Sequence, residues 1–296
     1  MHLVPVPGGR VLECLEVGDP GGRPVVYLHG TPGTAGCAAL LDGPARRQGV
    51  RLVAVSRPGY GGSATTAPGL TSVGADIGEL TAALGIEEFA VLGTSGGGPF
   101  ALAVAAAVPE RVRRVGVAAG PGSHCEVAPE VLDAQDFLAL DLLAAGDVAG
   151  AMAVLTTSAA AVFDAMTGLP ASEFVEAFSR VAPPTEHYFD SRPADRDVFF
   201  ADLHRALSGN REGYQEGGYQ GYVRDNLSWL GPWDFEPAEV VAPVVLSYGE
   251  ADAMVPRVHG EWLAARLPTS SLTVHPGAGH GDVTFGLAEW MLARLD

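Results

Sequence analysis

The stretch FAVLGTSGG, residues 89–97, is the strongest indication of fold class in this sequence. Its first four residues are uninterrupted and apolar, which is typical of a strand buried on both faces of a sheet. The motif Gly93-Thr94-Ser95-Gly96-Gly97 follows, and an Ala/Leu-rich segment from Ala101 then predicts a helix. A serine on a sharp strand-to-helix turn exposes its hydroxyl, and glycines on both sides relieve the crowding. We therefore interpret Ser95 as a nucleophile rather than a passive residue of a glycine-rich turn.

The segments around this motif alternate between strand and helix patterns. Apolar runs at residues 25–28, 52–55 and 115–117 indicate further buried strands, while residues 77–84 carry apolar residues at helical spacing. This alternation predicts βαβ units, a mostly parallel sheet and helices on both of its faces. Residues 11–17 alternate between apolar and polar instead, which predicts an antiparallel hairpin at the sheet edge.

The pattern changes after about residue 120. No clear buried strand occurs between residues 123 and 236, where helical stretches recur at 131–144 and 149–166. Strand and helix patterns then return in the order strand 243–248, helix 257–267, strand 271–275 and a final helix over about 281–295. The sequence predicts one α/β core, residues 1–122 and 237–296, interrupted by a helical cap, residues 123–236.

Composition narrows the possible functions. The 296 residues suffice for one large domain with an insertion, and 47% hydrophobic residues can form a sizeable core. A net charge of −17 would repel a phosphate backbone, so nucleic-acid binding is not expected. The N-terminus lacks the features of a signal peptide, and the most apolar stretch, residues 99–108, is too short to span a bilayer. We expect a cytoplasmic protein that does not bind membranes; its oligomeric state and protein partners are not readable.

The three cysteines predict no cofactor site. Cys14, Cys37 and Cys125 are widely spaced and form no metal-binding pattern with each other or with histidine. We interpret them as buried free thiols.

A serine nucleophile needs a base, and His280 is the best placed of the eight histidines. It follows the strand 271–275 within Gly277-Ala278-Gly279-His280-Gly281, and catalytic groups gather at the carboxyl edge of such a sheet. His275 lies inside that strand and is expected to be packed or exposed at the edge. His259 is expected on the surface of a helix.

The third group is a carboxylate that orients the imidazole, and Asp252 in the loop after strand 243–248 fits this role. Glu250 is the competitor in the same loop. Asp282 is too close in sequence to His280 to orient it, and we expect it to cap the last helix. Ser95, Asp252 and His280 follow one another along the chain as nucleophile, acid and base, which is an order known for one fold that carries such triads.

An oxyanion hole needs two N–H donors. One is expected from the backbone of Gly96, at the start of the helix after the nucleophile. The second is expected from the loop His29-Gly30-Thr31-Pro32-Gly33; Pro32 has no N–H, so Thr31 is the candidate. His29 is expected to hold this loop by hydrogen bonds rather than to catalyse.

These motifs, together with Ser56-Arg57-Pro58-Gly59-Tyr60-Gly61-Gly62-Ser63, resemble the α/β-hydrolase superfamily. The resemblance covers about residues 10–295 apart from the cap, and it is greatest to the group of proline iminopeptidases and small esterases. That group often has HGGPG where this chain has HGTPG. The resemblance implies the α/β-hydrolase fold, an eight-stranded mostly parallel sheet with an inserted helical cap. A serine at the strand-to-helix turn argues against dehalogenase and epoxide hydrolase chemistry, because the enzymes with those activities resemble this family but use Asp there. The resemblance implies neither a metal nor an organic cofactor.

We expect acyl transfer through a Ser-His-Asp acyl-enzyme, with an ester, lactone or thioester of a small molecule as substrate. A proline iminopeptidase-like aminopeptidase or amidase stays an alternative, as do C–C cleavage, lyase or cyclase chemistry without a cofactor and a non-catalytic receptor. Cap acids could bind a substrate amine but more often face solvent; the candidates are Glu173, Glu176, Glu212 and Glu216. Cap side chains could line a pocket or form the cap core, and core is the commoner role; they are Phe137, Phe163, Met166, Phe174, Tyr188, Phe199, Tyr219, Tyr222 and Trp229.

Overall fold

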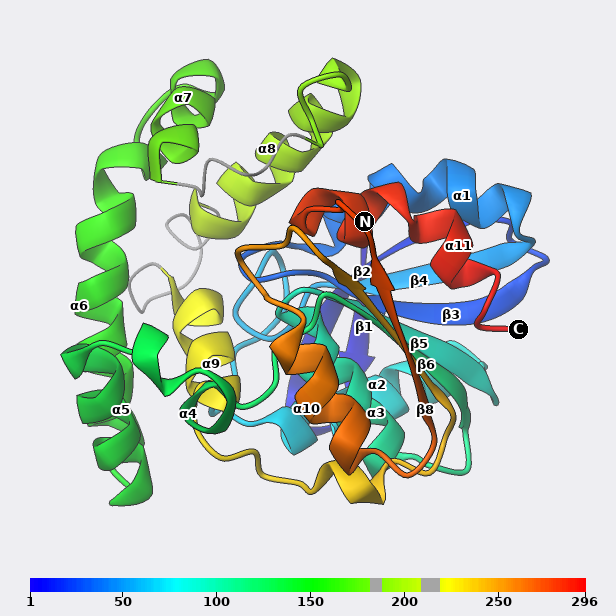
Figure 1. The fold of residues 1–296 in the computed structure, drawn as a ribbon, viewed down its shortest axis with the longest axis horizontal. Coiled ribbons are helices and arrows are strands. Elements are labelled where there is room, and N and C mark those ends of the chain that lie inside the picture. Colours follow the sequence, from blue (N-terminus) through cyan, green and yellow to red (C-terminus); the bar gives the residue numbers. More distant parts are fainter. Residues whose placement is uncertain (182–187, 209–218) are drawn as a thin grey trace.

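A mixed eight-stranded sheet forms the centre of the molecule (Figure 1). The structure is a computed structural model and describes residues 1–181, 188–208 and 219–296. The strand order is β1-β2-β4-β3-β5-β6-β7-β8, and all pairs from β4 to β8 are parallel. The strands are β1 His2–Val6, β2 Arg10–Gly18, β3 Arg23–Leu28, β4 Val50–Val55, β5 Phe89–Thr94, β6 Val112–Ala118, β7 Val244–Gly249 and β8 Ser270–His275. The predicted α/β fold with a mostly parallel sheet is confirmed.

The N-terminal hairpin is antiparallel and lies at the sheet edge, as predicted. Strand β2 pairs with β1 on one side and with β4 on the other, so β1 and not β2 is the edge strand. β1 is only five residues long and includes Pro5, which a sheet tolerates best at its edge. Its inward residues Val4 and Val6 join the core of the α/β unit.

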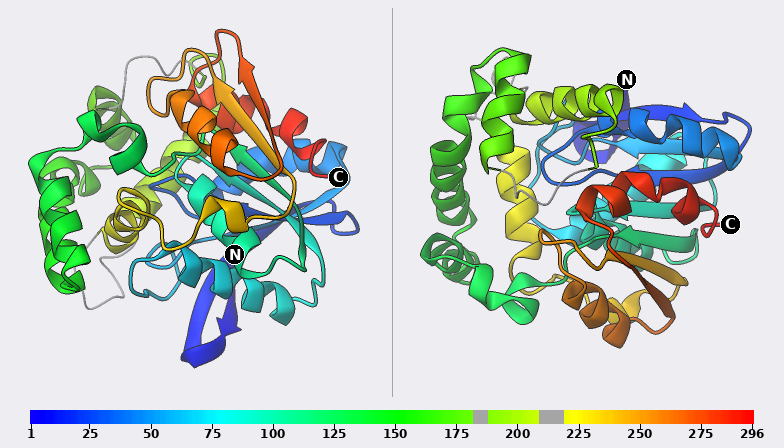
Figure 2. Two further views of the ribbon diagram at one scale, coloured as in Figure 1. Left: turned by 60° about the horizontal axis from the view of Figure 1, so that its bottom comes forward. Right: turned by 45° about the horizontal axis from the view of Figure 1, so that its top comes forward.

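Helices cover both faces of the sheet (Figure 2). One face carries α2 (Leu70–Ala83), α3 (Gly97–Ala107) and α10 (Val258–Arg266), whose apolar residues join one core cluster. The other face carries α1 (Asp42–Arg47) and α11 (Ala288–Leu292), which contribute to a second cluster. Because apolar layers lie on both sides, the central strands are buried on both faces, which explains their continuous apolar runs. Short 3-10 helices are η1 Pro7–Gly9, η2 Ala35–Leu41, η3 Pro129–Val131 and η4 Pro237–Glu239.

The predicted final helix over residues 281–295 is divided in the structure. A single π-type turn, η5 (Asp282–Gly286), precedes the short helix α11. The N–H of Leu287 bonds to the carbonyl of Asp282 at 2.8 Å, five residues back, which gives the π spacing. The helical periodicity of this segment does not show such a widened turn.

Helices make up the regular structure that is described between β6 and β7. They are α4 His124–Val127, α5 Ala134–Ala144, α6 Val148–Thr167, α7 Ala171–Val181, α8 Pro193–Ser208 and α9 Gln220–Trp229. They lie together on one side of the sheet (Figure 1), and α5 to α9 share an apolar cluster of their own. The division into core and cap at residues 123 and 236 stays a prediction, and we keep the name cap for residues 123–236.

Helix α6 is apolar and long enough, by length and composition alone, to cross a membrane. It is longer than the apolar segment 99–108. In the fold, Ala151, Leu155, Ala159 and Phe163 follow one another at four-residue spacing and are buried in the cap cluster. A helix that packs inside a domain meets the same criteria, so this one helix is weak evidence of a membrane span.

Candidate functional site

Ser95 occupies a strained turn between β5 and α3. Its φ of 50° lies in the left-handed region, which costs a non-glycine residue about 1–3 kcal/mol. The neighbouring glycines are required because a larger residue would clash with the backbone. A Cβ on Gly93 would lie 2.3 Å from the carbonyl oxygen of Gly97, and a Cβ on Gly97 would lie 2.2 Å from the carbonyl oxygen of Leu28. The fold therefore maintains the strained turn that the motif predicts, which exposes a serine hydroxyl at the carboxyl end of β5.

His280 and Asp252 form a buried pair at the same edge of the sheet. His280 Nδ1 lies 2.7 Å from Asp252 Oδ2, and the residues are 8% and 4% exposed. The other carboxylate oxygen accepts the N–H groups of Met254 at 2.9 Å and Val255 at 2.8 Å. With the carboxylate accepting, Nδ1 carries the proton, and Nε2 is the basic nitrogen of the ring. The pair thus presents one imidazole nitrogen that can accept a proton.

The competing carboxylates have other partners. Glu250 is exposed and accepts the N–H of Gly277 at 3.1 Å. The expectation that Asp282 caps the last helix is wrong: Gly281 occupies the N-cap position, and Asp282 Oδ2 accepts the N–H of Gly279 at 3.0 Å. Both acids therefore hold the loop that carries the imidazole.

The histidine expected on a helix surface is buried. His259 is 2% exposed, and its Nδ1 accepts the N–H of Gly122 at 3.1 Å. Burial lowers the pKa of His259 to about 4, so the ring is neutral at physiological pH. The prediction was wrong because α10 packs this face against the loop after β6. His275 is packed, which is one of its two expected placements: its Nε2 lies 2.9 Å from Ser247 Oγ.

One cavity of about 430 Å³ brings the predicted residues together. Ser95, His280 and Thr31 all line it, although they follow three different strands. Its other walls are mainly apolar and come largely from the cap; they include Phe178, Phe189, Phe199, Phe200, Leu203, Met254 and Phe285. A volume of this size suits a small organic molecule.

The loop after β3 is held as expected by His29. Nε2 of the ring accepts the N–H of Arg57 at 3.1 Å, so Nδ1 carries the proton and donates to the carbonyl of Gly30 at 2.7 Å. Burial, and then the Arg57 charge, lower the pKa of His29 well below its usual value, so the ring is neutral. Thr31 packs directly over Gly96: a Cβ on Gly96 would lie 3.3 Å from the Thr31 nitrogen. The two predicted N–H donors are therefore on adjacent segments.

The structure separates the cap residues that line the cavity from those that form the cap core. Of the nine side chains suggested for the pocket, Phe199 lines it. Phe163, Met166, Phe174 and Tyr219 are buried in the cap cluster instead. Glu173 and Glu176 are exposed, while Glu212 and Glu216 lie outside the described residues.

Three polar residues of the cavity carried no sequence signal: Asp190, Arg196 and Asp202. Asp202 is on α8 and 6% exposed, and its carboxylate accepts the N–H of Thr34 at 2.9 Å and also the Thr34 hydroxyl. Burial raises the pKa of Asp202 to about 6. An acid on a helix of mixed polarity is normally predicted to face solvent. Asp202 is buried because α8 packs over the loop after β3.

Asp202 makes stability depend on pH, because its folded pKa of about 6 exceeds an unfolded value of about 3.9. The native state then binds more protons between these values, so the unfolding free energy falls as pH rises from about 4 to 6. Relative to Asp202→Asn, which cannot titrate, the wild type should lose about 3 kcal/mol across this window. Guanidinium unfolding at a series of pH values measures the difference, with Glu173→Gln at an exposed position as control. A wild-type–minus–D202N difference that stays flat or rises with pH would contradict the assignment.

Comparisons with known proteins give a consistent result. A sequence profile of the alpha/beta hydrolase fold family matches residues 23–286. The dihydrolipoyllysine-residue acetyltransferase component of the acetoin cleaving system of Pseudomonas putida is 33% identical over 117 residues, which span 39% of this chain and only 31% of that relative. An alpha/beta hydrolase fold protein from Nakamurella multipartita is 24% identical, with a TM-score of 0.65 over 99% of this chain and 98% of that chain. A hydrolase from Pseudomonas aeruginosa PA01 is 18% identical, with a TM-score of 0.69 over 99% of this chain and 97% of that chain.

Proposed function

Because the chain belongs to the alpha/beta hydrolase fold family and is therefore assigned to the hydrolases, we propose that it is a serine hydrolase. Its substrate in this proposal is a carboxylic ester, lactone or thioester of a small molecule. The observation that carries the proposal is the strained Ser95 turn beside the buried His280–Asp252 pair, with the serine and the imidazole on one cavity.

The proposed reaction has two acyl-transfer steps. His280 Nε2 takes the proton of Ser95 as the hydroxyl oxygen attacks the substrate carbonyl, and Asp252 stabilises the imidazolium. The N–H groups of Gly96 and Thr31 hold the oxyanion of the tetrahedral intermediate. His280 then protonates the departing alcohol or thiol. A water molecule, deprotonated by the same nitrogen, releases the acid and restores Ser95.

The cavity wall supports an apolar substrate that bears no amine near the scissile bond. Five phenylalanines line the cavity: Phe178, Phe189, Phe199, Phe200 and Phe285. The cap acids Glu173 and Glu176, which could have bound a substrate amine, are exposed to solvent instead. Asp202 already accepts two hydrogen bonds from Thr34, which occupy part of its accepting capacity. We therefore propose ester-type rather than aminopeptidase activity.

Fluorophosphonate labelling, read by intact-protein mass, tests the nucleophile. The wild type should gain one phosphonyl group, and peptide mapping should place it on Ser95. A panel of p-nitrophenyl esters, lactones, thioesters and aminoacyl amides then tests the substrate class. Faster turnover of the amides would favour an aminopeptidase, and absence of both labelling and turnover would refute the proposal.

A further inference from the structure

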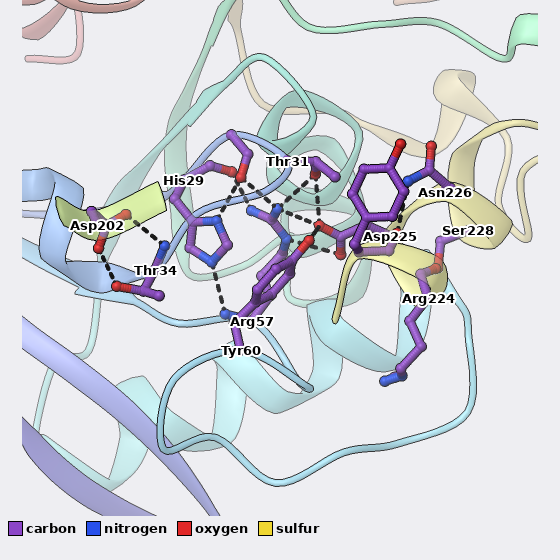
Figure 3. Close-up of polar contacts among 12 residues, drawn as sticks. His29, Thr31, Thr34, Arg57, Tyr60, Asp202, Arg224, Asp225, Asn226 and Ser228 are labelled. Atoms are coloured by element: carbon purple, nitrogen blue, oxygen red, sulfur yellow. Dashed lines mark hydrogen bonds and ion pairs between the residues drawn. The ribbon is translucent and has the colours of Figure 1, made fainter. Parts of the chain in front are cut away.

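A buried cation on the core side depends on the cap for its counter-charge. Arg57, from the motif after β4, is 0% exposed, and a buried guanidinium is stable only when it is paired and hydrogen-bonded. Its acidic partner is Asp225 on α9, which is 3% exposed: Nη2 lies 2.5 Å from Oδ2 and Nε lies 3.2 Å from Oδ1. The two side chains are 168 positions apart in the sequence and meet in a bidentate pair (Figure 3).

The Arg57–Asp225 pair also forms hydrogen bonds with the loop that carries the proposed oxyanion donor. The hydroxyl of Thr31 donates to Asp225 Oδ2 at 2.6 Å and accepts from Arg57 Nη2 at 3.0 Å. Arg57 also donates to the carbonyl oxygens of His29 and, at 3.2 Å, Gly30. Three consecutive residues of the loop are thus fixed by one ion pair, and half of that pair comes from the cap (Figure 3).

Two neighbours leave the Asp225 carboxylate little freedom. The hydroxyl of Tyr60 donates to Oδ2 at 3.0 Å, and the Arg57 guanidinium stacks over the Phe100 ring with 4.8 Å to its centroid. Burial and then the Asp225 charge raise the pKa of Tyr60 well above its usual value, so this hydroxyl stays protonated as a donor. The carboxylate is therefore held in one position by donors from both sides.

The position of Thr31 matters for chemistry because it lies against Gly96. A Cβ on Gly96 would lie 2.3 Å from Thr31 Oγ1 and 2.8 Å from its Cβ, so the threonine side chain is packed onto the turn after the nucleophile. Contacts that fix this side chain on both sides also restrict the Cα of the same residue and, with it, the position of its N–H. Displacement of such a donor by about 1 Å can cost about 100-fold in rate.

We propose that Asp225 is a positioning residue through which the cap sets the oxyanion hole. Its carboxylate holds the Thr31 hydroxyl directly and the rest of the loop through Arg57, so that the docked cap and the aligned oxyanion donors form one structural unit. Asp225 itself does not touch the reacting atoms. The inference rests on the proposed function, since the oxyanion hole is part of that proposal.

Asp225→Asn and Thr31→Val test the two ends of this connection. Each should lower kcat by about 10- to 100-fold on the best ester of the panel while KM changes little. A trifluoromethyl ketone, whose hydrated or serine-bound form carries the oxyanion, should lose affinity in parallel with kcat/KM. Thr31→Ser keeps the hydroxyl and should retain near wild-type kcat, whereas a purely structural role would not produce this split.

The double variant and a matched control complete the test. If Asp225 acts through the threonine hydroxyl, the double variant D225N/T31V should have a kcat no lower than that of the less active single variant. Asp234→Asn removes another cap carboxylate that contacts the core, where it accepts the Thr71 hydroxyl at 2.8 Å, and should leave kcat unchanged. Should D225N fail to fold, T31V against T31S decides the question alone.

The failures are distinguishable. Wild-type kcat in both T31V and soluble D225N, with the wild type active and labelled at Ser95, would overturn the inference and leave the proposed function intact. A wild type that neither turns over the panel nor reacts with fluorophosphonate would overturn both.

Discussion

Replacing Ser95 with alanine should lower kcat on the best ester substrate by about 10⁵- to 10⁶-fold. The hydroxyl is the proposed attacking group, and His280 and Asp252 cannot act on the substrate through a covalent intermediate without it. Stopped assays with a sensitive p-nitrophenyl ester measure the residual rate. Fluorophosphonate should no longer add mass to the variant.

Two comparisons make this result specific. Ser72→Ala removes an exposed hydroxyl at 3.1 Å from the carbonyl of Gly69 and should keep both activity and labelling. S95A should bind the trifluoromethyl ketone more weakly, because the covalent bond to the serine oxygen is lost, and should still unfold cooperatively. Retention of wild-type turnover by S95A would end the acyl-enzyme mechanism.

Replacing Asp252 with asparagine should lower kcat by about 10⁴-fold. Nδ1 of His280 donates its proton to the carboxylate, with 2.7 Å between Nδ1 and Oδ2, so Nε2 is the nitrogen that takes the serine proton in the proposed reaction. An amide in that place can donate to Nδ1 and thereby select the other tautomer, in which Nε2 carries the proton. Oδ1 of Asp252 accepts the N–H groups of Met254 and Val255. Asparagine also has an acceptor oxygen, so the loop should keep its structure.

Glu250→Gln is the matched control in the same loop. Its carboxylate accepts only a backbone N–H, that of Gly277, among the bonds described for it, and an amide oxygen can do the same. E250Q should therefore turn over like the wild type. A result with E250Q inactive and D252N active would reassign the acid of the triad.

Features of this protein with a local physical cause can be predicted from its amino-acid sequence. A buried apolar run followed by glycines and serine predicts the turn at Ser95, because that turn requires residues without bulk on both sides. Parallel strands place their carboxyl ends at one edge, so loops after three strands were expected to meet there. Asp252 and His280 do form a hydrogen-bonded pair, and Thr31 reaches the same cavity.

Which cap residues contact the cavity and the loop after β3 depends on how distant segments pack, and the sequence does not show it. Asp202 and Asp225 lie on helices of mixed polarity, and in sequence they are indistinguishable from Glu173, which is exposed. His259 was wrongly expected on the surface for the same reason. A charged side chain on a helix is buried or solvated according to what packs on its face, and that neighbour comes from residues far away in the chain. The residue spacing along one helix therefore does not predict that these two acids contact the loop after β3.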